Sequence, residues 1–109
     1  MAGTPEGDGW HLVARRGDID PDEPKQVQVG DLFIGLYEVG GQIYAINDVC
    51  THEFAFLSEG YVDGDMVECP FHQACFHIPT GQAKSPPADK PVATYAVKVD
   101  GDDVYIQVT

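Results

Sequence analysis

Two short segments of the chain each combine one cysteine with one histidine. The first has the pattern C-x-H and the second has the pattern C-x-x-H, with sixteen residues between them. Thiolate and neutral imidazole groups both bind transition metals, and each pair is close enough in sequence for one loop to deliver two ligands. The spacing therefore predicts one metal centre held by four side chains, Cys50, His52, Cys69 and His72.

Two kinds of metal centre use two cysteines and two histidines. One is a tetrahedral zinc site that staples a fold. The other is a [2Fe–2S] cluster in which one iron takes the two thiolates and the second iron takes the two imidazoles. The ligand spacing is unlike that of the usual zinc finger, and the apolar segments suffice for a core without a metal. We therefore favour the cluster and keep a zinc-stapled interaction module as the alternative.

The segments that must position these ligands have the pattern of short β-strands. From Trp10 onward, apolar residues recur at every second position, and turn residues interrupt them every few positions. This pattern favours no helix, and Gly40-Gly41 and Asp100-Gly101-Asp102 are typical of hairpin turns. Strands are predicted over residues 10–14, 26–29, 31–39, 42–47, 66–68, 75–78, 93–100 and 103–108.

The predicted fold class is all-β, a small antiparallel β-barrel or sandwich. Each cysteine–histidine pair follows a predicted strand, so a rigid scaffold can hold the loop that carries it. A chain of 109 residues has room for a single core. We expect one domain over residues 10–109, after a flexible N-terminus at residues 1–9 that contains three glycines and one proline.

Charge and composition exclude several classes of partner. Eighteen acidic residues against six basic ones give a formal net charge of −12, which repels nucleic acid and anionic membranes. The longest apolar stretch, residues 32–37, is too short to span a bilayer. An odd number of cysteines, three, and no leader with a basic and then an apolar region favour reduced thiols in the cytoplasm.

The four predicted ligands lie among further motifs. These are IYAIND at residues 43–48, CTH at 50–52, LSEGY at 57–61, ECPFH at 68–72, Phe76, TG at 80–81 and SPP at 85–87. Together they resemble the Rieske ferredoxin family, in particular the small ferredoxins of bacterial aromatic-ring-hydroxylating dioxygenase systems. The resemblance implies a Rieske-like fold whose cluster-binding subdomain is formed by two loops.

This resemblance also implies the ligand arrangement of one Rieske [2Fe–2S] cluster. Cys50 and Cys69 would bind the inner iron, and His52 and His72 would bind the outer iron with their ring edges facing solvent. The segment SPP is similar to a third loop that covers the cluster. We interpret Cys75 as a small residue packed beneath the second loop, and we interpret His77 as an ordinary strand histidine.

The function that the resemblance implies is one-electron transport in aromatic hydrocarbon catabolism. The donor would be a flavin-dependent NADH:ferredoxin reductase, because the chain has no G-x-G-x-x-G fingerprint of its own. The acceptor would be a terminal Rieske oxygenase, which adds a mononuclear iron in a separate domain. His11 and His77 are the histidines left over here, so we expect a carrier and not an enzyme.

Two further expectations concern partners. A freely diffusing carrier is expected to be a monomer. Its acidic residues near the loops are candidates for docking on basic patches of a partner. That they are ordinary solvated charges is an equally good interpretation. The candidates are Glu53, Glu59, Asp63 and Asp65. The alternative function is a Rieske-like small subunit of a nitrite reductase. Many such subunits lack cluster ligands, which this chain retains.

The residues beside the ligands predict a low reduction potential. High-potential Rieske proteins have an extra disulfide between the loops, and a serine and a tyrosine that donate hydrogen bonds to the cluster. This chain has Ala55 and Phe71 in place of those cysteines, and Ala74 and Phe76 in place of the hydroxyl residues. Fewer donors stabilise the reduced charge less, so voltammetry should give a value toward the low end of about −150 to +300 mV. A strongly positive potential would contradict this prediction.

Overall fold

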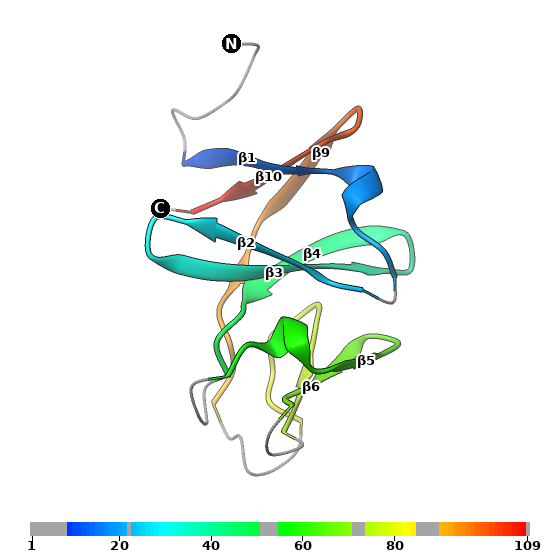
Figure 1. The fold of residues 1–109 in the computed structure, drawn as a ribbon, viewed down its shortest axis with the longest axis vertical. Coiled ribbons are helices and arrows are strands. Elements are labelled where there is room, and N and C mark those ends of the chain that lie inside the picture. The colour runs from blue at the N-terminus through cyan, green and yellow to red at the C-terminus, as the bar shows by residue number, and fades with distance from the viewer. Residues whose placement is uncertain (1–8, 22, 51–54, 71–73, 85–89, 109) are drawn as a thin grey trace.

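The computed structural model describes residues 9–21, 23–50, 55–70, 74–84 and 90–108 (Figure 1). Over these ranges the chain forms ten strands and two single-turn 3-10 helices, with no α-helix. The strands are β1 (Trp10–Arg15), β2 (Lys25–Val29), β3 (Leu32–Val39), β4 (Gln42–Asn47), β5 (Tyr61–Asp63), β6 (Met66–Glu68), β7 (Cys75–His77), β8 (Thr94–Tyr95), β9 (Val97–Asp100) and β10 (Asp103–Gln107). The 3-10 helices are η2 (Arg16–Asp18) and η3 (Leu57–Glu59). The predicted all-β fold class is confirmed.

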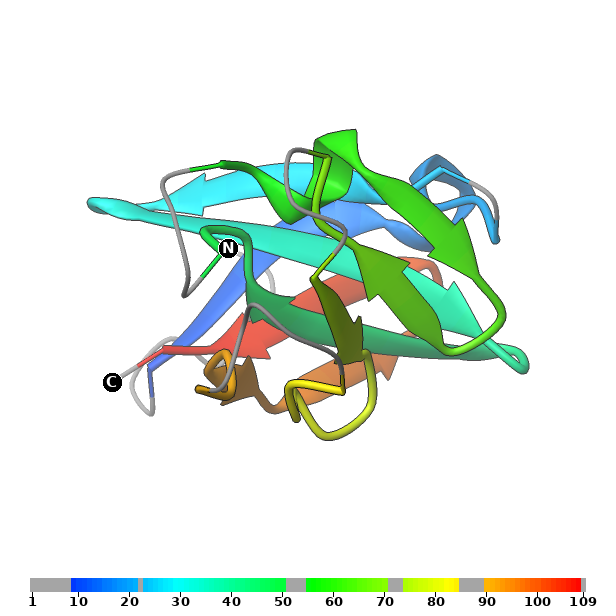
Figure 2. The same ribbon diagram turned by 90° about the horizontal axis from the view of Figure 1, so that it is seen from below.

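The strands form three antiparallel sheets. Their orders are β1-β10-β9, β2-β3-β4-β8 and β5-β6-β7. Figure 1 shows β5 and β6 at the lower end of the molecule, below β3 and β4. Seen from below, the third sheet lies in front of β3 and β4, with β1 and β10 behind them (Figure 2). The sheet that contains β3 and β4 is therefore the middle layer of the fold.

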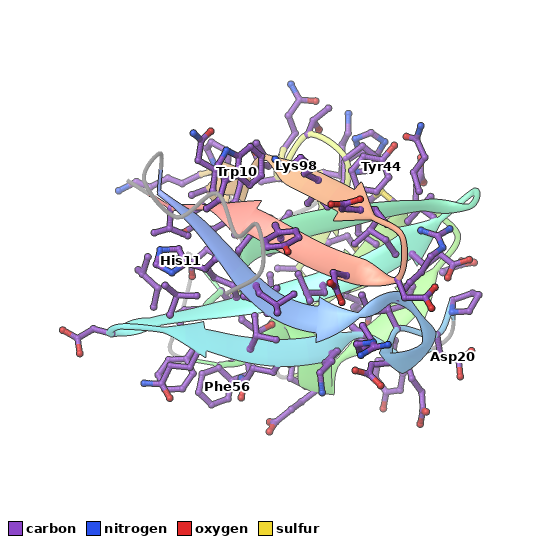
Figure 3. All side chains as sticks on the ribbon, turned by 90° about the horizontal axis from the view of Figure 1, so that it is seen from above. Trp10, His11, Asp20, Tyr44, Phe56 and Lys98 are labelled. Carbon is purple, nitrogen blue, oxygen red and sulfur yellow. The ribbon has the colours of Figure 1, made fainter. Side chains whose placement is uncertain are left out.

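One core, which we call the base core, lies on the upper side of this middle layer. It packs β3 and β4 against β10, and Figure 3 shows β1 and β10 crossing over β2 and β3. Its buried members are Ile19, Ile34, Leu36, Ile43, Ala45, Val104 and Ile106. The alternation of side chains along β3 and β4 places these residues on one face of the sheet.

A second core, which we call the metal-end core, lies on the opposite face of β3 and β4. Tyr37 of β3 and Ile46 of β4 point into it, and the third sheet covers it. Its other buried members are Cys50, Ala55, Leu57, Val67, Cys69, Ala74, Phe76, Ile78 and Val92. Strands β3 and β4 are therefore buried on both faces, which explains why Ile34 to Tyr37 form an unbroken buried run.

The structure adds one strand that the sequence pattern did not predict. β5 is three residues long, and Tyr61 and Asp63 face outward while Val62 turns inward. A single inward apolar residue gives no alternation to detect. The strand exists because it pairs with β6, where Val62 lies opposite Val67.

The predicted strand at residues 93–100 is wrong in one respect, because it is two strands. β8 pairs with β4 in the middle sheet, whereas β9 pairs with β10 in the first sheet. The chain changes sheets at Ala96, whose carbonyl oxygen accepts a hydrogen bond of 3.0 Å from the backbone N–H of Gln107. Local periodicity is continuous across this change of partner, so the sequence pattern does not reveal it.

Both predicted hairpin turns are confirmed. Gly40 and Gly41 have φ angles of 60° and 84°, and Gly101 has a φ of 63°. Residues 1–8 lie outside the described ranges, so the flexible N-terminus and the start of the domain stay predictions. In the described ranges no helix has the length and apolar composition needed to cross a membrane.

Gly60 is predicted to be a point where a side chain is not tolerated. Its φ of −89° is ordinary, but an added Cβ would overlap the backbone carbonyl oxygen of Glu68, the residue before Cys69. We expect Gly60→Ala to push β6 away and to lower the free energy of unfolding by about 3 kcal/mol, measured in urea. Gly101→Ala is the control: its turn is open, so only about 1–2 kcal/mol of left-handed strain is expected. Equal losses in the two variants would contradict the steric argument.

Candidate metal centre

The two loops that carry the predicted ligands are closed by the same backbone contact. The N–H of Cys50 donates a hydrogen bond of 2.9 Å to the carbonyl oxygen of Ala55, and the N–H of Cys69 donates one of 2.7 Å to that of Ala74. Each cysteine therefore begins a six-residue segment that returns beside it. The predicted ligands His52 and His72 lie outside the described residues.

Each loop rises from a short antiparallel stem. Below the first loop, Val49 pairs with Phe56, and the N–H of Leu57 donates a hydrogen bond of 2.7 Å to the carbonyl oxygen of Asp48. The ring of Phe56, labelled in Figure 3, lies 5.1 Å from the ring of Phe33 between centroids. These contacts attach the first loop firmly to the middle sheet. Strands β6 and β7 form the stem of the second loop.

The two cysteines meet in the same apolar environment. Cys50 is 4% exposed and Cys69 is 1% exposed, and both belong to the metal-end core. None of the three cysteines is in a disulfide. A buried thiolate needs a strong electrostatic partner, which a metal ion supplies. Two buried cysteines from equivalent stems therefore fit the thiolate side of a [2Fe–2S] cluster.

The structure describes three of the four positions that predict a low potential, and Phe71 lies outside the described residues. Ala74 and Phe76 are fully buried at the base of the second loop, and Ala55 is buried at the base of the first. None of them has a hydroxyl group. The predicted third loop at residues 85–87 lies outside the described residues. Its flank begins beside β7, where the N–H of Lys84 donates a hydrogen bond of 2.7 Å to the carbonyl oxygen of Cys75.

His77 is a strand histidine whose ring nitrogens both have partners. Its Nδ1 lies 2.8 Å from Thr80 Oγ1, and its Nε2 lies 2.9 Å from Asp65 Oδ2. These contacts tie β7 to the turn between β5 and β6, which is a structural role. Cys75 lies two pairs closer to the loop, opposite Glu68, and is half-buried.

The docking candidates differ in their surroundings. Glu59 is exposed on η3 and Asp63 is exposed on β5. Asp65 is exposed too, but its carboxylate contacts His77. Glu53 lies outside the described residues.

One residue of the site was missed by sequence reasoning. Asp48 is fully buried directly below the first loop. The signal available in the sequence was an aspartate at the end of an apolar strand, two residues before a predicted ligand. Such a residue is usually a turn residue, and only the neighbours brought by the fold show that it is interior.

Comparison with known proteins identifies the family of this chain. The family model described as the Rieske [2Fe–2S] domain matches residues 9–96. The chain belongs to the Rieske family.

Individual relatives of the Rieske family match most of this chain. The 3-phenylpropionate/cinnamic acid dioxygenase ferredoxin subunit of Shigella flexneri is 50% identical over 92 residues, which are 84% of this chain and 86% of that protein. Ferredoxin CarAc of Metapseudomonas resinovorans is 41% identical over 98 residues, which are 89% of this chain and 92% of that protein. A chain of the solved complex of reduced oxygenase and oxidized ferredoxin in carbazole 1,9a-dioxygenase superimposes with a TM-score of 0.86 and 40% identity, covering 92% of this chain and 94% of that chain.

A more distant likeness shows the fold alone. A putative nitrite reductase small subunit has a TM-score of 0.78 but 21% identity, covering 91% of this chain and 98% of that chain. Family membership confirms the predicted cofactor, one Rieske [2Fe–2S] cluster, and the zinc-stapled module is set aside. Because its relatives are ferredoxin components, the chain is a Rieske ferredoxin that carries electrons.

Replacement of the cysteines one at a time tests the predicted ligands. We expect Cys50→Ala and Cys69→Ala to abolish iron and sulfide binding, because each removes one of two thiolates on the same iron. Cys75→Ala is the matched control, since Cys75 lies on β7 beyond the loop, and it should keep both irons and both sulfides. The readouts are iron and sulfide analysis and the rhombic EPR signal of low average g after dithionite reduction. Retention of the signal in Cys69→Ala, or its loss in Cys75→Ala, would contradict the assignment.

Proposed function

We propose that this Rieske ferredoxin passes single electrons from a flavin-dependent NADH:ferredoxin reductase to a terminal Rieske oxygenase that hydroxylates aromatic substrates. The observation that carries the proposal is the pair of buried cysteines on two equivalently closed loops at one end of the molecule. Relatives that are ferredoxin subunits of dioxygenases support it. The solved complex of an oxygenase with a ferredoxin supports the acceptor.

We assign the cluster ligands to four residues. Cys50 and Cys69 bind the inner iron, and His52 and His72 bind the outer iron. When bound, a Rieske cluster supplies a one-electron couple tuned by its ligands and by nearby hydrogen bonds. The chain supplies burial of the two thiolates and two stiff stems on a sheet that is packed on both faces.

The chain acts as a carrier and not as an enzyme in this proposal. Its relatives are components that work with a separate oxygenase, so substrate oxidation belongs to that partner. We place the carrier in the cytoplasm as a monomer, because its thiols have to stay reduced for metal binding and a shuttle has to leave one partner before it meets the next. Gel filtration measures the oligomeric state.

The distribution of charge favours basic partner surfaces. Residues 26–83, which contain both loops and the third sheet, include no lysine or arginine. The basic residues are Arg15, Arg16, Lys25, Lys84, Lys90 and Lys98. This stretch is therefore acidic, with Lys84 at its edge beside β7, and opposite charge on a partner would steer the stretch toward that partner.

Electrostatic docking predicts a specific pattern of kinetic effects. We expect Glu59→Gln and Asp63→Asn each to lower the second-order rate of reduction by the reductase a few-fold at low ionic strength, with the loss fading as salt is added. Asp100→Asn, an exposed carboxylate at the β9–β10 turn, is the control and should leave the rate unchanged. Stopped-flow absorbance follows the reduction. A wild-type rate that is insensitive to ionic strength would contradict the docking argument.

A further inference from the structure

One carboxylate lies in the interior of the protein. Asp48, the first residue after β4, is 0% exposed, and it is the one buried charged side chain among the described residues. Its Oδ2 accepts hydrogen bonds of 2.7 Å from Gln26 Nε2 and 2.6 Å from Ser58 Oγ, and its Oδ1 accepts one of 2.7 Å from the Ser58 N–H. Gln26 belongs to β2, and Ser58 belongs to η3 after the first loop. The carboxylate therefore joins the middle sheet to the far side of that loop.

The carboxylate lies on the cysteine side of the middle sheet. A Cβ built on Gly35 would lie 3.1 Å from Asp48 Oδ1 and 3.2 Å from the Tyr37 hydroxyl oxygen. Gly35 and Tyr37 share one face of β3, because side chains alternate along a strand, and Tyr37 is part of the metal-end core. Glycine at position 35 thus leaves the space that the carboxylate and the tyrosine ring occupy.

Asp48 is also close to the first cysteine along the chain. It precedes Cys50 by two residues, which limits the separation of their Cα atoms to about 7 Å. Cys50 belongs to the metal-end core, on whose side of the sheet the carboxylate lies. The negative charge and the first proposed ligand are therefore near neighbours on the same side of the middle sheet.

The hydrogen-bond partners of this carboxylate carry no positive charge. Its partners are a side-chain amide, a hydroxyl and a backbone N–H, which are neutral donors that match the acceptors of an ionised carboxylate. The Tyr37 hydroxyl beside it has no hydrogen-bond partner in the described part of the chain. Burial, and then the negative charge of Asp48, raise the pKa of that hydroxyl, so Tyr37 stays neutral.

We propose that Asp48 lowers the reduction potential of the metal centre, because it holds a fixed negative charge beside the first loop. The inference rests on the proposed role of Cys50 as a ligand. Reduction brings one electron, and hence one negative charge, to the metal centre, with no other reactant than the electron donor. A fixed negative charge nearby raises the free energy of the reduced state more than that of the oxidised state. Water screens exposed carboxylates strongly, whereas a buried one keeps its effect.

The direct test compares two variants that each remove one negative charge. Asp48→Asn removes the buried charge, and Asp102→Asn removes an exposed one at the far β9–β10 turn. Potentials are measured by mediated titration of the purified holoprotein, with EPR and iron analysis to show that the centre is intact. At a fixed applied potential we expect the ratio of reduced to oxidised protein to rise on the order of tenfold in Asp48→Asn. For a one-electron couple this corresponds to a reduction potential that is about 59 mV more positive. The ratio should change by less than about twofold in Asp102→Asn.

Two further variants separate charge from loop structure. Ser58→Ala keeps the charge but removes a donor that partly neutralises it, so the potential should become more negative. Tyr37→Phe removes a neutral hydroxyl beside the carboxylate and should leave the potential unchanged. If these substitutions acted by loosening the first loop, the reduction potentials of Asp48→Asn and Ser58→Ala would instead shift in the same direction.

The outcomes decide the proposal in each case. It is overturned if Asp48→Asn shifts the potential no more than Asp102→Asn does, or if Ser58→Ala moves it in the same direction as Asp48→Asn. If Asp48→Asn does not fold, Ser58→Ala decides: a more negative potential supports the proposal, and an unchanged or more positive one overturns it. No protein partner takes part in these measurements. Failure of the proposed electron-transfer chain would appear separately, as a wild-type protein with a normal potential that the reductase does not reduce.

Discussion

Burial of β3 and β4 on both faces is the constraint on which the rest of this structure depends. One face closes the base core against β10, and the other carries Tyr37 and Ile46 into the metal-end core. Loss of either layer would expose a face of the same two strands, so the metal-binding end and the base stabilise each other. A sheet that is packed on both sides is also a rigid support for loops that hold a metal centre.

The metal-binding end has to reconcile buried polar groups with an apolar core. Cys50 and Cys69 are buried there, and each uses its backbone N–H to close its own loop onto an alanine. The two loops are therefore closed by the same kind of backbone hydrogen bond. Asp48 meets the same problem differently, since three neutral donors satisfy its oxygens and leave its charge in place.

Charge is distributed unevenly along the chain. Residues 26–83, which carry both loops, include acidic residues and no lysine or arginine, whereas the basic residues fall before and after this stretch. An electron carrier has to dock quickly and leave quickly, and long-range attraction increases the rate of encounter without requiring a tight interface. On this view the exposed acidic residues raise the rate of docking, and the buried Asp48 lowers the reduction potential of the metal centre.

The sequence by itself determined the chemistry and the fold class of this protein. Ligand type and spacing are local properties, and so are the alternation of β4 and the glycines of the Gly40-Gly41 turn, which is why these predictions needed no tertiary contact. Only the tertiary structure decided that Tyr61–Asp63 is a strand, that the chain changes sheets at Ala96, and that Asp48 is interior. The change of sheet depends on β4, which pairs with β8 from far away in sequence, and the burial of Asp48 depends on Gln26 and Ser58. β5 depends on its hairpin neighbour β6, because one inward apolar residue gives no pattern of its own. Local patterns record which residues prefer burial, but pairing and burial of a polar group are settled by the neighbours that folding brings together.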